Sequence, residues 1–359
     1  MGVIVEKHQS ARLVRQMGLW GLAATGICSM LGASINVVPF MIQRNVPGIG
    51  EYVLPAFMFA AVPALLAAFA YSILASAMPR AGGSYIYASR GLSPYLGFIA
   101  SFSQWFGLSI VIGVIAYIIV SFFRDIALGM QWQEAAQWLE QGVVKVVIAL
   151  SLIWGFVLVN VRGVQFYQRI LIPLMVLMFA LGAIVIVAGL SFDHSDFAAA
   201  LEQREGRALP DPGHSMFDWR VFLSAAAVLF ASFIGFDSIA QAGGEAKNPS
   251  RSLPLAIGLA ISIVGCFYFL FTYAVYNAVP WTFIAQEAMT KDISAPGVLG
   301  YLLPASLSVT ILVGASIALI NDLPAMLLSV SRLMFAWAED GIFPRRIGRV
   351  HPRFHTPHI

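Results

Sequence analysis

Long uncharged, apolar stretches recur along the chain and alternate with short polar segments. A helix needs roughly 20 apolar residues to cross the hydrocarbon core of a bilayer. The stretches reach this length, in some cases together with uncharged polar flanks, and they predict an all-α integral membrane protein of about eight spans. The predicted spans cover residues 18–42, 52–78, 93–123, 143–161, 170–191, 220–243, 254–279 and 305–337.

The composition agrees with this pattern and excludes several classes of protein. Apolar residues make up 59% of the 359 residues, charged residues only 11%, and the mean hydropathy is +0.81. A soluble domain has about a quarter of its residues charged, so an ordinary soluble enzyme and a disordered chain are excluded. The net charge of +3 is too small to indicate a nucleic-acid partner. Cys28 and Cys266 show no metal-type spacing and no histidine lies in a span, so we expect no cofactor and no metal site.

The distribution of basic residues predicts the orientation. If the N-terminus is cytoplasmic, the cytoplasmic segments carry 14 of the 21 lysines and arginines, as the positive-inside rule requires. We therefore expect both termini, and the loops near residues 80–92 and 244–253, on the cytoplasmic side of the inner (cytoplasmic) membrane. On the other side, residues 131–141 predict a short amphipathic helix, and Phe192–Trp219 predicts a solvated loop.

Two spans carry signals that break helices. Span one has Gly26 and Gly32, and span six has Gly235 and Asp237 near its centre. Broken helices survive in lipid only where they line a cavity enclosed by protein. Close packing of small residues is the alternative explanation for either span alone. Two interrupted spans at corresponding positions of two halves, however, are the sequence signal of a secondary-transporter site.

Several motifs follow one another in a fixed order along the chain, and together they are specific. They are Gly32-Ala33-Ser34-Ile35, Pro79-Arg80-Ala81-Gly82-Gly83-Ser84-Tyr85, Phe233-Ile234-Gly235-Phe236-Asp237-Ser238, Glu245-Ala246-Lys247-Asn248-Pro249, and Ser331-Arg332 followed by Asp340-Gly341. In these motifs the chain resembles the amino acid–polyamine–organocation (APC) permeases over nearly its whole length. It departs from them at Ser34 and Asn36, where the family commonly has a glycine and an aromatic residue.

The resemblance implies a LeuT-like inverted-repeat fold with two halves of five helices. We expect a single permease domain over residues 1–359, with the first repeat at 18–191, a partial second repeat at 220–337 and a cytoplasmic tail at 338–359. Because only three spans follow the first five, the chain looks like a permease truncated after its eighth span.

The expected substrate site lies between the two breaks. After the first break the helix restarts near Ala33–Ile35, where free amides at a helix N-terminus form a site for the substrate carboxylate. Carbonyls of residues 231–234 would meet the amino group, with Phe230 or Phe233 closing over the side chain. The candidate binding residues are Gly26, Gly32, Ala33, Ser34, Ile35, Phe230, Ala231, Phe233, Ile234 and Gly235.

Asp237, Asn321 and Asp322 are candidates for ion coupling or for helix capping, since acids within spans are functional candidates by default. Asp322 stands two residues before Pro324, a spacing typical of a helix start, so span eight is expected to be broken or kinked there. The coupling ion could be H⁺ or Na⁺. Some family members place a lysine in span five for proton coupling, and this chain has no charged residue between Arg169 and Asp193.

These observations predict a secondary active transporter of an amino acid or related amine that works by alternating access in the lipid bilayer. A nutrient sensor or an ion importer on the same scaffold is the alternative. An intramembrane enzyme would need paired acids on one helix or a histidine cluster at membrane depth, and the spans contain neither.

Overall fold

The computed structural model describes residues 13–210, 213 and 215–357, and every regular element in these ranges is helical. Eight of its helical segments are long and apolar enough to cross a membrane, which confirms the eight predicted spans. They are Leu19–Asn45, Gly50–Ala77, Pro94–Gly129, Gly142–Val161, Val164–Ser191, Trp219–Glu245, Pro249–Ala278 and Ala305–Glu339. The protein is therefore a multi-pass membrane protein.

The spans are built from continuous helices, broken helices and short 3₁₀ turns. The elements are α1 (Leu19–Leu31), α2 (Ala33–Asn45), η1 (Gly50–Tyr52), α3 (Val53–Ala77), α4 (Gly83–Gly91), α5 (Pro94–Gly129), α6 (Gln133–Glu140), α7 (Gly142–Val161), α8 (Val164–Ser191), α9 (His194–Glu205), α10 (Trp219–Phe230), η2 (Ala231–Phe233), α11 (Asp237–Gln241), η3 (Ala242–Glu245), α12 (Pro249–Ala278), α13 (Trp281–Thr290), α14 (Ala295–Leu299) and α15 (Ala305–Glu339).

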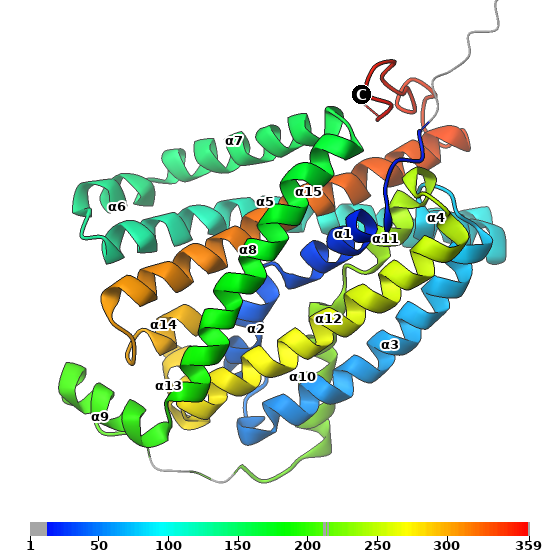
Figure 1. The fold of residues 1–359 in the computed structure, drawn as a ribbon. Helices are drawn as coiled ribbons and strands as arrows, with labels where there is room; N and C mark the ends of the chain where they lie inside the picture. The colour runs from blue at the N-terminus through cyan, green and yellow to red at the C-terminus, as the bar shows by residue number, and fades with distance from the viewer. Residues whose placement is uncertain (1–12, 211–212, 214, 358–359) are drawn as a thin grey trace, which may run out of the picture.

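The long helices run alongside one another, so the bundle has two ends (Figure 1). One end carries α4, the start of α1 and the C-terminal end of α15, and we call it the α4 end. The opposite end carries α9, α13 and α14, and we call it the α9 end. Span one lies at the centre of the bundle: 88% of its most apolar stretch is buried, against 6% for α7. It packs against α8, α11, α12 and α15.

The three spans that extend furthest beyond their predicted limits do so past charged residues. α8 begins at Val164 and so includes Arg169, and α12 begins at Pro249 and includes Arg251. α5 continues to Gly129, past Arg124 and Asp125, whose side chains are 2.6 Å apart. Long basic side chains reach the polar interface from inside a helix end, and paired charges need less hydration. A charge therefore does not mark the end of a helix, although the predicted limits assumed that it does.

Span eight was predicted to be broken or kinked at Asn321 and Asp322, and the break is wrong. α15 runs without interruption from Ala305 to Glu339, with Pro324 in its interior. A proline is tolerated inside a membrane helix where neighbouring helices satisfy the freed backbone groups. A proline lacks the amide that would bond to the carbonyl four residues earlier. Asn160 on α7 donates its side-chain amide to the Pro324 carbonyl itself at 3.2 Å, and this bond joins α15 to α7 beside the proline.

The segment predicted as a solvated loop at Phe192–Trp219 contains a helix. α9 begins after Asp193, whose side chain accepts the Ser195 and Asp196 amides, while Asp196 returns a bond to the Asp193 amide. The Ser195 hydroxyl and these amides lower the pKa of Asp193. This reciprocal capping box is readable in the sequence as two acids three residues apart. The predicted amphipathic helix at 131–141 is confirmed as α6.

A buried ion pair joins span six to span eight at the α4 end. Arg332 donates through Nη2 to Glu245 Oε1 at 2.5 Å and through Nε to Oε2 at 3.1 Å, and each side chain is only 1% exposed. From its position at a span end, Arg332 could be expected to reach the membrane interface. The structure shows that it points into the protein, because its partner is a buried carboxylate on span six.

Candidate functional site

Two spans of the bundle are interrupted near their middles. α1 ends at Leu31, Gly32 adopts φ −50° and ψ −122°, and α2 begins at Ala33 without a side-chain cap. In span six, α10 gives way to η2, Ile234 is extended, and Gly235 has φ +139° before α11 begins. Only glycine adopts that last conformation readily, so Gly235 is required by the geometry of the break.

The two breaks lie against each other. A Cβ on Gly235 would meet the carbonyl of Ser29, so this glycine permits direct backbone contact between spans one and six. Just beyond, the Ser29 hydroxyl donates to the Ser238 hydroxyl at 3.0 Å. One turn earlier in span one, Gly26 leaves room for Ile239 of α11. Small residues at these positions bring two interrupted backbones together at membrane depth.

A tyrosine on α12 connects both breaks. The Tyr268 hydroxyl lies within hydrogen-bonding distance of the Met30 carbonyl in span one and 2.9 Å from the Ser232 carbonyl in span six. Carbonyls in unwound backbone need donors where no water is present, and a single hydroxyl is placed to serve both. The sequence did not single out Tyr268. Its signal is a polar group in the middle of an otherwise apolar span.

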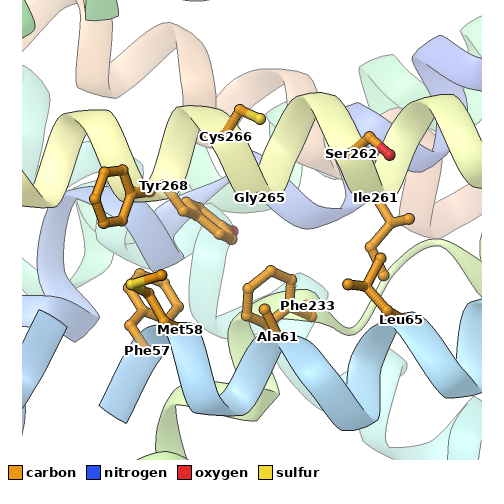
Figure 2. A pocket seen from close by; sticks show the side chains of 11 residues that line it. Phe57, Met58, Ala61, Leu65, Phe233, Ile261, Ser262, Gly265, Cys266 and Tyr268 are labelled. Carbon is orange, nitrogen blue, oxygen red and sulfur yellow. The ribbon is translucent and has the colours of Figure 1, made fainter. Parts of the chain in front are cut away.

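An apolar groove of about 360 Å³ lies between α3 and α12, next to the span-six break. Figure 2 shows Phe57 and Met58 on α3 facing Tyr268 on α12, Leu65 facing Ile261, and Phe233 between the two helices. The Phe233 ring packs 5.5 Å from Phe57 and 5.6 Å from Tyr268, measured between centroids. Because Phe233 belongs to η2, its ring forms the wall between the groove and the break.

On its other side, the span-one break faces span eight. A Cβ on Gly32 would overlap the Asp322 carboxylate, which is 3% exposed. The neighbouring Asn321 donates its amide to Cys28 Sγ at 2.9 Å. Within the described part of the chain, Asp322 Oδ1, Asn321 Oδ1 and Ser232 Oγ are buried without a hydrogen-bond partner. Buried polar atoms are nearly always paired, so this group near the breaks indicates a site for a ligand or ion.

Asp237 binds the span-six break itself. Its Oδ1 accepts the Gly235 amide at 3.1 Å, and its Oδ2 accepts the side-chain amide of Gln104 on α5. Gln104 also bonds to Ser84 on α4, and Gln241 donates to Ser84 at 2.9 Å. Asp237 thus accepts the amide of Gly235 inside the break. The network fastens the break to α4 and α5.

The structure places the predicted binding residues in three groups. Gly235 lies where the breaks touch, with Gly26 near it against Ile239, whereas Gly32 faces Asp322 and Phe233 lines the groove. Ile35 is buried in the first turn of α2, Phe230 is half-buried, and the side chains of Ala231 and Ile234 are exposed. The Ala33 and Ser34 side chains lie outside the described part of the structure; their backbone begins α2.

The carbonyls expected to bind an amino group are partly occupied. The Ala231 carbonyl accepts the Ile234 amide at 3.2 Å, and the Ser232 carbonyl lies 2.9 Å from the Tyr268 hydroxyl. Those of Phe233 and Ile234 follow in the unwound stretch. This leaves a narrower set of candidate acceptors than the sequence suggested.

Two broken helices in contact within a multi-pass helical bundle are typical of secondary transporters. In that class, the broken spans hold a small polar molecule or an ion. Residues 17–359 match the amino acid permease family, and the chain belongs to that family. This membership confirms the APC resemblance.

The chain is also similar to individual transporters. It is 25% identical over 372 residues to the methylthioribose transporter of Bacillus subtilis, covering 98% of this chain and 73% of that protein. It is 28% identical over 360 residues to the vacuolar cationic amino acid transporter 4 of Arabidopsis thaliana, covering 99% and 57%. It is 26% identical over 306 residues to the low-affinity putrescine importer PlaP of Escherichia coli, covering 84% and 63%.

Proposed function

We propose that the protein is a secondary active transporter that carries an amino acid or a related amine by alternating access. The observation that carries this proposal is the contact between two broken helices, flanked by buried polar atoms that lack partners. Relatives named for cationic amino acids and for putrescine support the amine-related substrate class.

We further propose that the α4 end faces the cytoplasm and that the membrane is the inner membrane of the cell. Of the 19 basic residues that the structure describes, 12 belong to the segments at the α4 end, and cytoplasmic segments of membrane proteins are enriched in lysine and arginine. Substrate would then enter from the α9 end and leave at the α4 end.

In the proposed site, the substrate carboxylate binds the first amides of α2. These amides are at the N-terminus of a 13-residue helix with no side-chain cap, where unpaired N–H groups and the helix dipole favour an anion. The amino group binds the carbonyls of Phe233 and Ile234. Phe233 then bounds the substrate side chain, since its ring already separates the break from the groove.

Asp322 couples a cation to this binding step. Its carboxylate lies against Gly32, beside the amides that would receive the substrate carboxylate. Two negative charges in so apolar a place repel strongly, so the substrate carboxylate binds best when Asp322 holds a proton or a Na⁺ ion. The attraction is mutual, because a coupling free energy between two ligands acts equally on both.

The test is uptake by proteoliposomes that contain the protein, using radiolabelled L-arginine, L-lysine, L-leucine and putrescine. For the amino acid taken up best, half-saturation is expected at a lower concentration as the pH falls, or as Na⁺ is added at constant pH. Asp322→Asn should remove that dependence, because the amide is neutral at every pH and binds Na⁺ weakly.

Asp237→Asn serves as the comparison. Asp237 accepts an amide inside the span-six break, so its loss should lower the melting temperature and leave the cation dependence of binding in place. Unchanged cation dependence in Asp322→Asn would exclude Asp322 as the coupling group. Failure of all four compounds to accumulate would contradict the transport proposal.

A further inference from the structure

A second cavity, of about 760 Å³, opens at the α4 end, far from the breaks. The last turn of α15 and Gly244 in η3 line it together with three connecting segments: the residues before α1, the connection from α3 to α4, and the chain after α15. Each contributes an arginine, namely Arg15, Arg80 and Arg345. Its size is within the range of small-ligand sites, roughly 300–1,000 Å³.

The cavity is electropositive. Among the described residues that line it, Glu339 is the one acid, against three arginines. All three arginines are exposed, and within the described ranges no ion pair or side-chain hydrogen bond ties any of them to another residue. The guanidinium group donates in a planar fork that matches the oxygens of a phosphate. Three guanidinium groups around one cavity are therefore complementary to a phosphate group.

The position adds a second argument. Arg15 lies four residues before α1, Arg80 three residues after α3, and Arg345 six residues after α15, so the cavity is level with the ends of three spans. The lipid phosphates of a bilayer lie at this level, and basic residues next to span ends attract anionic lipids.

We propose that this basic cavity binds a phosphate-bearing anion. A bound phosphate would also fasten the three segments together. The segment before α1 is already held to span six, since the Gln16 and Met17 amides bond to the Glu245 carbonyl at 2.9 and 2.8 Å. If alternating access operates as proposed above, these segments must separate when the α4 end opens, and the bound anion would favour the closed α4 end.

The experiment compares the protein in nanodiscs of phosphatidylcholine alone with nanodiscs that also contain phosphatidylglycerol. Bound lipid is counted by native mass spectrometry, and the melting temperature is measured in parallel. The test variant carries Arg15→Gln, Arg80→Gln and Arg345→Gln. The matched control carries Arg162→Gln, Arg251→Gln and Arg346→Gln, three exposed arginines at the same end that do not line the cavity.

The wild type and the control are expected to retain phosphatidylglycerol and to melt at a higher temperature with it. The test variant should bind it at least about tenfold more weakly, while melting like the wild type in phosphatidylcholine alone. If millimolar inorganic phosphate raises the melting temperature equally in phosphatidylcholine alone, the anion is a soluble phosphate rather than a lipid headgroup. That result would still support the proposed phosphate site.

Two results would overturn the proposal. One is equal loss of binding in the test and control variants, which would show a general effect of charge. The other is the absence of any binding or stabilisation by either phosphate source. Neither outcome depends on transport, so the test is independent of the proposed function.

Discussion

Replacing Arg332 with methionine is expected to lower the free energy of unfolding by about 3–5 kcal/mol. Glu245 and Arg332 are each 1% exposed and are joined by two hydrogen bonds. Removing the arginine alone would leave a buried carboxylate without a partner. Equilibrium unfolding in mixed micelles measures the change, and Arg251→Met, an exposed arginine on α12, is the control, expected to shift stability by less than about 0.5 kcal/mol.

A double variant distinguishes the ion pair from simple packing. Glu245→Leu combined with Arg332→Met removes both charges, and apolar residues of similar volume often replace a buried pair without loss. The double variant should therefore be more stable than Arg332→Met alone. An Arg332→Met protein as stable as the wild type, or a double variant less stable than either single one, would contradict the buried pair.

Gly32→Leu is expected to weaken substrate binding by about ten- to a hundredfold. Even a Cβ at this position would overlap the Asp322 carboxylate, so a larger side chain must displace the Asp322 side chain from the first break. Overpacking of this kind costs about 1–3 kcal/mol, the free-energy equivalent of that loss. Binding of the best-transported amino acid, measured by scintillation proximity, gives the result.

Gly107→Leu is the matched control for that substitution. Gly107 lies on α5, and a Cβ there would meet nothing within 4 Å, so this variant should bind and melt like the wild type. If Gly32→Leu still binds with wild-type affinity, the contact between Asp322 and the first break is not part of the site. Cooperative melting of both variants shows that they are folded.

The sequence predicted the spans because their signal is local. Twenty consecutive uncharged residues identify a membrane helix whatever it packs against. The breaks were also predictable, since Gly32 and Gly235 interrupt apolar runs in two separate spans. Residues such as Arg124 and Arg169 misled the prediction of span limits, because a sequence does not show whether a charge is paired or can reach the interface.

The rest of the site depends on contacts between distant residues. Tyr268 joins carbonyls 36 and 238 residues away along the chain, and Arg332 finds its partner 87 residues away. Asp322 and Pro324 are typical of a helix start, yet α15 continues through both residues. The local sequence could identify these residues as unusual within apolar spans. Their partners are known only from the packing of the helices.

The central claim is that the substrate carboxylate binds the α2 amides at the first break. The most direct measurement compares the Kd of the best-transported amino acid with that of its carboxamide, in which a neutral amide replaces the carboxylate. We expect the carboxamide to bind at least about tenfold more weakly, a difference of roughly 1.4 kcal/mol. Equal affinity for the two compounds would contradict it, because the α2 amides would then not hold the carboxylate.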